Sequence, residues 1–173
     1  MSGSRVSTSR SERRRWLLVP LALGLLGASY GALSFTTLTG ETVSLHPGAE
    51  KRAVILHFWA TWCPTCVEEM DALDTVTEPC RESGVRVVAI NVGEDSDEIG
   101  EFAREHRLDL AMLRDPRGKV WRKLSGQGLP INVVWTVEER RVHVGPQSQE
   151  WWQQTLASLG CAPTESSPRG HGE

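Results

Sequence analysis

Cysteine is scarce in this chain, with four residues out of 173, too few for a disulfide scaffold to hold the protein together. Clusters of lysine and arginine are missing after residue 33, where 14 basic residues stand against 21 acidic ones. We therefore expect no nucleic-acid partner, because phosphate binding needs clustered positive charge. The chain has no apparent internal repeat, and its length suits one domain of about 100–150 residues with short extensions.

The first 33 residues differ from the rest in composition. Five arginines and a single acid, Glu12, lie at this end, and the apolar run WLLVPLALGLLGASYGALSF begins at Trp16. A basic segment followed by an apolar one is typical of a signal peptide or of an N-terminal membrane anchor. We expect residues 1–33 to be one of these two, and the folded part to be periplasmic or otherwise extracytoplasmic, in the second case anchored in the inner membrane.

The remaining sequence predicts alternating strands and helices. Ser34–Leu45 contains two short β-type runs around Thr39-Gly40-Glu41 and predicts a hairpin. Nearly continuous apolar runs at Arg52–Trp59 and Val85–Val92 predict strands buried on both faces. Helices are expected at 63–83, 95–106, 119–124 and 149–159, and further strands at 111–113, 131–137 and 140–144. The Pro-, Ser- and Gly-rich residues 162–173 predict a disordered tail.

This order of elements predicts an α/β fold. A strand, a helix and a second strand give a parallel pair, and the later hairpin adds antiparallel strands. We therefore expect one domain over residues 34–161, with a mixed central sheet flanked by helices and an N-terminal β-hairpin.

The segment FWATWCPTC, residues 58–66, carries the chemistry, at the exit of a buried strand and the start of a helix. Cys63 and Cys66 lie in the first helical turn, where they can close a disulfide with little backbone movement. The helix N-terminus stabilises a thiolate, so we expect Cys63 to attack a substrate disulfide and Cys66 to resolve the mixed disulfide. Pro64 suits the helix start because it lacks an N–H, and Trp62 flanks the attacking cysteine.

The same segment, followed by Glu68-Glu69-Met70, resembles the TlpA-type family of extracytoplasmic thioredoxins. That family includes the reductases of cytochrome c maturation. The resemblance extends from about Ser34 to Leu159 and includes the run VRVVAINVGED and the tripeptide Gly128-Leu129-Pro130. It implies a thioredoxin fold and a thiol–disulfide oxidoreductase that needs no cofactor.

The resemblance also implies roles and partners. Pro130 would be cis and lie against the disulfide, and the backbone of Leu129 would pair with substrate. The partners would be protein thiols and disulfides, together with a membrane electron donor that returns the cysteines to the dithiol form. The enzyme would then act as a reductant of protein disulfides.

Several alternatives stay open. An oxidase or isomerase of the same fold is one, although a mature part of about 140 residues leaves no room for the helical insertion of strong periplasmic oxidants. A metallochaperone holding Cu(I) between the two thiolates is another, but it gives Pro130 and the tryptophans no purpose. Zinc would need a second pair of ligands at matched spacing, which the sequence lacks, so we expect no metal. An inert structural disulfide would not need the flanking tryptophans.

Three further positions carry expectations. His57 lies where thioredoxins often carry a buried acid that relays a proton to the second cysteine, and it is either such a relay or a neutral core histidine. Cys80 and Cys161 follow two helices whose ends are neighbours in the thioredoxin fold, so we expect a structural disulfide, with two free buried thiols as the alternative. Glu68 and Glu69 are expected to be solvated.

Overall fold

The computed structural model describes residues 30–161, apart from residues 51 and 81. Most of the expected signal or anchor segment, and all of the expected tail, lie outside the described residues. Within the part of the chain that the structure describes, no helix is both long and apolar enough to cross a membrane.

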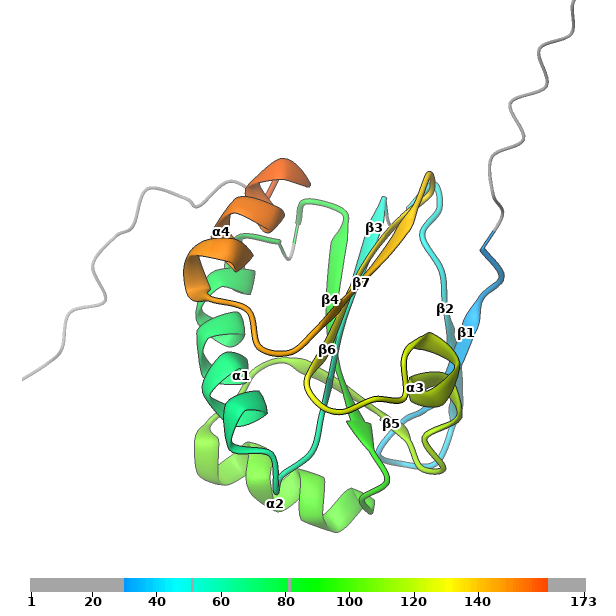
Figure 1. The fold of residues 1–173 in the computed structure, drawn as a ribbon, viewed down its shortest axis with the longest axis vertical. Helices are drawn as coiled ribbons and strands as arrows, with labels where there is room; N and C mark the ends of the chain where they lie inside the picture. The colour runs from blue at the N-terminus through cyan, green and yellow to red at the C-terminus, as the bar shows by residue number, and fades with distance from the viewer. Residues whose placement is uncertain (1–29, 51, 81, 162–173) are drawn as a thin grey trace, which may run out of the picture.

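A mixed sheet of seven strands forms the centre of the molecule (Figure 1), with the strand order β2-β1-β5-β4-β3-β6-β7. The strands are β1 (Leu33–Thr36), β2 (Thr42–Leu45), β3 (Ala53–Trp59), β4 (Val85–Val92), β5 (Ala111–Asp115), β6 (Ile131–Thr136) and β7 (Arg140–Val144). β3, β4 and β5 run parallel to one another. β6 pairs antiparallel with β3, and β7 pairs antiparallel with β6. The predicted thioredoxin-like fold and its N-terminal hairpin are confirmed.

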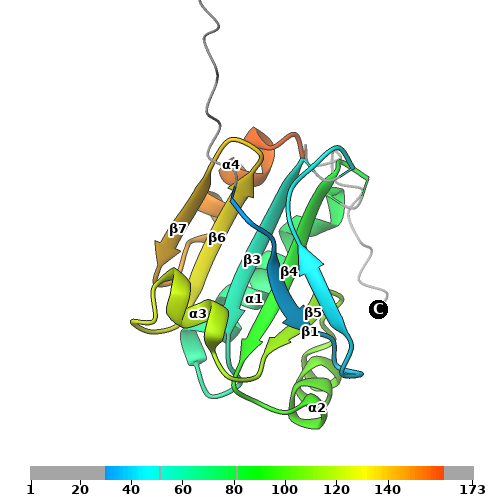
Figure 2. The same cartoon turned by 90° about the vertical axis from the view of Figure 1, so that its right-hand side faces the viewer.

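Helices lie on both sides of the sheet. They are α1 (Pro64–Thr77), α2 (Ser96–His106), α3 (Lys119–Leu124) and α4 (Gln149–Ser158). Figures 1 and 2 show α1, α2 and α4 on one side of the sheet and α3 on the other, and side chains of the β1–β2 edge pack with the β3 side chains that face α3. The sheet is therefore the middle of three layers.

The helix expected over residues 63–83 is shorter than predicted. α1 ends at Thr77, and a 3-10 turn over Glu78–Cys80 follows it. Pro79 explains the difference, because proline has no N–H for the helical ladder and its ring collides with the carbonyl four residues earlier.

β3 is buried along its whole length because both of its faces are covered. Its side chains alternate: Val54, Leu56 and Phe58 join the core cluster that contains the hairpin residues. The alternate residues Ile55 and Trp59 join clusters that contain cysteines on the α1 side. His57 has the same alternation and faces that side.

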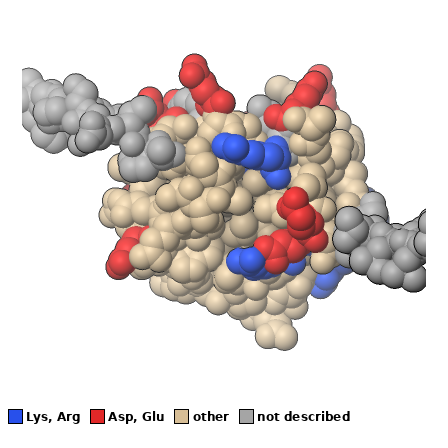
Figure 3. All heavy atoms as spheres, turned by 90° about the horizontal axis from the view of Figure 1, so that it is seen from above, with Lys and Arg blue, Asp and Glu red and all other residues tan. Residues whose placement is uncertain are grey.

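The two cysteine pairs lie at opposite ends of β3. Cys80 and Cys161 pack with Ala53 at the start of the strand. Cys63 and Cys66 pack with Trp59 at its end. Figure 3 views the molecule from the Ala53 end, where acidic and basic side chains are interspersed among uncharged ones.

Candidate active site

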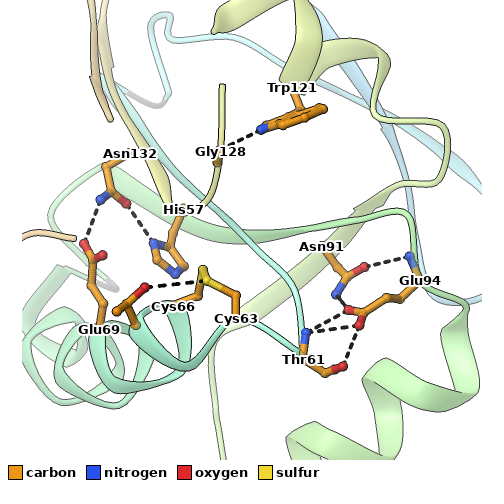
Figure 4. Close-up of a disulfide and its surroundings, with 11 residues drawn as sticks. His57, Thr61, Cys63, Cys66, Glu69, Asn91, Glu94, Trp121, Gly128 and Asn132 are labelled. Carbon is orange, nitrogen blue, oxygen red and sulfur yellow. Dashed lines mark hydrogen bonds between the residues drawn. A yellow bond between two sulfur atoms is a disulfide. The ribbon is translucent and has the colours of Figure 1, made fainter. Parts of the chain in front are cut away.

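The Cys63–Cys66 disulfide lies where β3 passes into α1 (Figure 4). The two sulfur atoms are 2.08 Å apart and the two Cα atoms 5.3 Å apart. Cys63 is the N-cap of α1 in an extended conformation, and Pro64 begins the helix. The carbonyl of Cys63 accepts hydrogen bonds from the N–H groups of Cys66 and Val67, at 3.0 and 3.2 Å.

The two cysteines differ in access to solvent. Cys63 is 6% exposed and Cys66 is wholly buried. An incoming partner can therefore reach the sulfur of Cys63 first. The free N–H groups of the helix start also favour negative charge there, so Cys63 is the better-placed thiolate in the reduced protein.

A cis peptide bond lies beside the disulfide. It joins Leu129 to Pro130, and Pro130 is buried. Leu129 packs against the cluster that contains Cys63 and Cys66. The indole Nε1–H of Trp121 donates to the Gly128 carbonyl at 3.0 Å, which fixes the segment before the cis bond. The structure thus places Leu129 against the cluster that contains the cysteine pair and makes the Leu129–Pro130 bond cis, as expected.

Trp62 stands out from the surface next to Cys63. It is 69% exposed, more than any other large hydrophobic residue that the structure describes. Exposure of such a large apolar ring to water is unfavourable in the free protein. The indole is therefore available to pack against a partner.

The loop before Cys63 is held by Glu94, a residue that sequence reasoning missed. The Thr61 N–H donates to both carboxylate oxygens of Glu94, at 2.9 and 3.1 Å, and Thr61 Oγ1 also donates to it. Asn91 Nδ2 donates to the same carboxylate. Asn91 is the register partner of Trp59 on the parallel strand β4. In the sequence, Glu94 stands just after the strand Val85–Val92, and this position was the available signal.

A buried chain of hydrogen bonds lies behind the disulfide on the α1 side. His57 Nδ1 is 2.7 Å from Asn132 Oδ1, and Asn132 Nδ2 is 2.7 Å from Glu69 Oε1. Trp152 Nε1, from α4, is 2.9 Å from the same Glu69 oxygen. His57, Asn132 and Trp152 are wholly buried. Figure 4 shows His57 next to the disulfide, with Asn132 and Glu69 following in order.

The expectation that Glu69 is solvated is wrong, since its side chain is only 4% exposed. Glu69 lies three positions after Cys66 in α1, so both residues share the helix face that packs on the sheet. That spacing was readable in the sequence. The partners Asn132 and Trp152 were not, because they come from distant elements. Glu68, by contrast, is exposed as expected.

Burial shifts the titration of both ionisable members of this chain. Desolvation lowers the pKa of His57 from 6.5 to about 4, while contacts with Asn132 and the Cys66 backbone act in the opposite direction. Desolvation raises the pKa of Glu69 from 4.5 to about 7, and the hydrogen bonds from Trp152, the Gln147 backbone and Asn132 oppose this rise. Near neutral pH, His57 is therefore neutral and Glu69 is close to its midpoint.

Cys80 and Cys161 form a second disulfide, with their Cα atoms 4.9 Å apart. Both cysteines are nearly fully buried, at 2% and 3% exposed. Ser83 Oγ lies 3.3 Å from Cys161 Sγ. This bridge joins the last residue of the 3-10 turn to a residue three positions after the end of α4. Among the described residues, no group of three or more His, Cys, Asp or Glu side chains is placed to hold a metal ion.

Several known proteins are similar to this chain. Thiol-disulfide oxidoreductase ResA of Geobacillus thermodenitrificans is 27% identical over 166 residues, 84% of this chain and 94% of that protein. Thioredoxin-like protein YneN of Bacillus subtilis is 36% identical over 130 residues, 71% of this chain and 74% of that protein.

Solved structures agree on the fold. A secreted disulfide oxidoreductase of Mycobacterium tuberculosis superposes with a TM-score of 0.61 and 24% identity, over 73% of this chain and 95% of that one. The AhpC/TSA family matches residues 27–142, more than half of the sequence. On these matches and on the thioredoxin-like fold, the chain belongs to the AhpC/TSA family.

Proposed function

We propose that this protein is a thiol–disulfide oxidoreductase that exchanges disulfides with protein substrates through Cys63 and Cys66. The observation that carries the proposal is the placement of the Cys63–Cys66 disulfide at the start of α1, beside the cis Leu129–Pro130 bond. The printed names of the relatives, thiol-disulfide oxidoreductase and disulfide oxidoreductase, support it.

The reaction runs in two displacements. In the reduced protein, the Cys63 thiolate attacks one sulfur of a substrate disulfide and forms a mixed disulfide, and the other substrate sulfur leaves as a thiolate that takes up a proton. Cys66 then loses its proton and attacks the Cys63 sulfur. The second substrate sulfur leaves and is protonated in turn. Two electrons pass to the substrate, which becomes a dithiol, and the enzyme becomes the disulfide seen here.

Leu129 and Trp62 would hold the substrate during this exchange. The resemblance to TlpA-type thioredoxins supports pairing of the Leu129 backbone with an extended substrate segment, and Leu129 packs against the cluster that contains Cys63 and Cys66. Trp62 supplies apolar contact on the other side of Cys63. Both contacts favour a polypeptide over a small molecule as the substrate.

Direction and location form the finer part of the proposal. The resemblance to TlpA-type reductases supports reduction of protein disulfides outside the cytoplasm, with cytochrome c maturation as one such pathway. The basic and apolar N-terminal composition supports export, with the segment either cleaved or kept as an anchor in the membrane. A membrane electron donor would then return Cys63 and Cys66 to the dithiol form.

His57 is proposed as the proton acceptor for Cys66. Cys66 is buried, so water cannot take its proton directly. The His57 ring lies beside the disulfide and also contacts the Cys66 backbone (Figure 4). As the Cys66 thiolate forms, its negative charge favours the imidazolium and raises the pKa of His57 above its value in the disulfide form. General-base assistance of this kind accelerates a step by roughly 10²–10⁴-fold.

Reduction of insulin by the purified protein, with dithiothreitol as the electron source, tests the proposed function. We expect Cys63→Ser to abolish turnover and Cys66→Ser to accumulate mixed disulfides through Cys63, seen by mass spectrometry. The double variant Cys80→Ser/Cys161→Ser is the control and should turn over at a rate close to that of the unmodified protein. Full activity of Cys63→Ser would show that the proposed mechanism is wrong.

A further inference from the structure

The hydrogen-bond chain behind the disulfide has a direction, and Trp152 sets it. An indole N–H can only donate. Because Trp152 Nε1 lies 2.9 Å from Glu69 Oε1, that oxygen is an acceptor. Asn132 shares the same oxygen at 2.7 Å, and the ionised carboxylate can only accept, so Asn132 presents its amide NH₂ group there. The carboxamide orientation of Asn132, on β6, is thus linked through Glu69 to Trp152 on α4.

The orientation of Asn132 in turn selects the tautomer of His57. With its NH₂ group on Glu69, Asn132 points its carbonyl oxygen at His57 Nδ1, 2.7 Å away. A carbonyl accepts, so Nδ1 must carry the hydrogen, and the neutral imidazole has only one. Nε2 is therefore left with its lone pair.

The position of Nε2 gives this tautomer a use. Nε2 is buried and has no hydrogen-bond partner among the described residues. A buried polar atom without a hydrogen-bond partner is uncommon in folded proteins, so this lone pair calls for an explanation. The ring lies beside the disulfide in Figure 4, on the side of Cys66. The Cys66 backbone interacts favourably with the charged ring, which helps His57 to hold a second proton.

Resting on the proposed function, we infer that Trp152 and Asn132 are positioning residues that hold His57 in the Nδ1–H tautomer, with Nε2 ready to accept the Cys66 proton. Neither residue touches substrate or the reacting sulfur atoms. They act through Glu69 and His57, and their effect falls on the second displacement only.

When Glu69 is protonated, the hydrogen bond from Trp152 helps to keep the NH₂ group of Asn132 pointed at Glu69. Burial places the pKa of Glu69 at about 7, so the carboxyl group holds a proton for part of the time near neutrality. A carbonyl oxygen accepts more strongly than the oxygen of an O–H group, so the indole N–H on Oε1 favours Oε1 as the carbonyl oxygen and Oε2 as the oxygen that carries the proton. Without the indole N–H, a proton on Oε1 could donate to Asn132 and turn its carboxamide over. His57 would then be protonated on Nε2.

The groups that face this chain are few. From α1, Cys66 and Glu69 are the ionisable residues nearest to His57, and the β4 residue in register with it is Ala89. His143 of β7 is in register with Asn132, and burial lowers its pKa. The pH dependence of the chain near neutrality is therefore set mainly by Glu69.

Trp152→Phe tests the inference, with Trp151→Phe as the matched control on the same helix. Reduced protein is mixed with excess 5,5′-dithiobis(2-nitrobenzoate). The first nitrothiobenzoate released reports attack by Cys63, and the second reports resolution by Cys66. We expect Trp152→Phe to leave the first phase unchanged and to slow the second by roughly threefold to tenfold at about pH 6, with general-base assistance reduced but not abolished. The slowing should shrink as the pH rises and Glu69 loses its proton.

The nitrogen NMR shifts of the His57 ring provide a second, non-kinetic measurement. The unmodified protein and Trp151→Phe should show hydrogen on Nδ1 at every pH where the ring is neutral, whereas Trp152→Phe should show a mixture at low pH. Asn132→Leu, which removes the carbonyl acceptor, should lose the tautomer preference at all pH values. A structural role alone would lower stability without moving these shifts.

Two results overturn the inference while leaving the proposed function intact. One is hydrogen on Nε2 in the unmodified protein. The other is equal second-phase rates for Trp152→Phe and Trp151→Phe across the pH range. Loss of both phases in the unmodified protein would instead remove the proposed function itself.

Discussion

The molecule contains two disulfides with opposite surroundings. Cys63 and Cys66 are three residues apart, at a helix start, with polar and ionisable groups behind them and the exposed Trp62 beside them. Cys80 and Cys161 are 81 residues apart, at the other end of β3, inside a cluster of apolar side chains that includes Ile55 and Leu156. The same covalent bond is thus placed once in a setting for exchange and once in a setting for stability.

The difference shows what makes a cysteine pair reactive in one fold. Reactivity needs a stabilised thiolate, an accessible sulfur and a path for the proton of the partner thiol. The first pair has the helix start and the more exposed sulfur, and the proposed function gives the Cys66 proton a path to His57. The second pair has an apolar environment, which disfavours a thiolate, and almost no access to solvent.

The first way to sharpen this comparison is to remove the second bridge. Cys80→Ser/Cys161→Ser opens a loop with a sequence separation of 81 residues. In the chain-entropy model we expect a loss of about 4 kcal/mol in the free energy of unfolding. Urea denaturation followed by circular dichroism measures it. An unchanged denaturation midpoint, or a loss of insulin reduction at low temperature, would break the division between the two pairs.

Sequence reasoning reached most of the fold because its signals are local. The buried strands Ala53–Trp59 and Val85–Val92 are short apolar runs, and the motif at Cys63–Cys66 gives its own position between strand and helix. The end of α1 was misplaced because Pro79 was not weighed against the helical pattern that continues through it. Its effect is also local, so this error was avoidable.

The rest of the site depends on contacts between distant segments. Glu69 was expected to be solvated with the other acids of its helix, yet its partners Asn132 and Trp152 are 63 and 83 positions away. The packing of α4 against α1 brings Trp152 to Glu69, and the pairing of β6 with β3 places Asn132 beside His57. Glu94 similarly reaches Thr61 over 33 positions, across the ends of two parallel strands. Such pairs leave no mark in the spacing of one sequence.

The second way to sharpen the comparison uses pH. The pKa of His57 is about 4 in the folded protein against 6.5 unfolded, so the unfolded chain binds the proton first and stability is lost as the pH falls through this window. The pKa of Glu69 is raised from 4.5 to about 7, so the folded protein keeps its proton and stability is lost as the pH rises through that window. The two slopes oppose each other where the windows overlap.

Glu69→Gln should uncover the His57 slope. We expect the free energy of unfolding of this variant to fall by about 3 kcal/mol between about pH 6.5 and pH 4, more steeply than in the unmodified protein. His57→Leu is the matched variant and should show the opposite slope. Denaturant titrations at a series of pH values measure both. If the free energy of unfolding changes with pH in the same way in all three proteins, the buried groups behind Cys63 and Cys66 do not make that end of β3 sensitive to pH.

The smallest expected effect concerns Trp62, the exposed residue that has no counterpart beside Cys80 and Cys161. Because 69% of its side chain is exposed, we expect Trp62→Ala to change the free energy of unfolding by about 0.5 kcal/mol or less. The same change removes an aromatic contact for a docked polypeptide, which we expect to be worth about 1–2 kcal/mol, or roughly tenfold in kcat/KM for insulin. Single-turnover reduction of a small disulfide, 5,5′-dithiobis(2-nitrobenzoate), by the reduced protein needs no such contact and should keep its rate. Equal losses for both substrates would mean that Trp62 acts on the Cys63 thiolate itself. The two disulfides would then differ in the reactivity of the Cys63 thiolate and not in a docking surface for substrate.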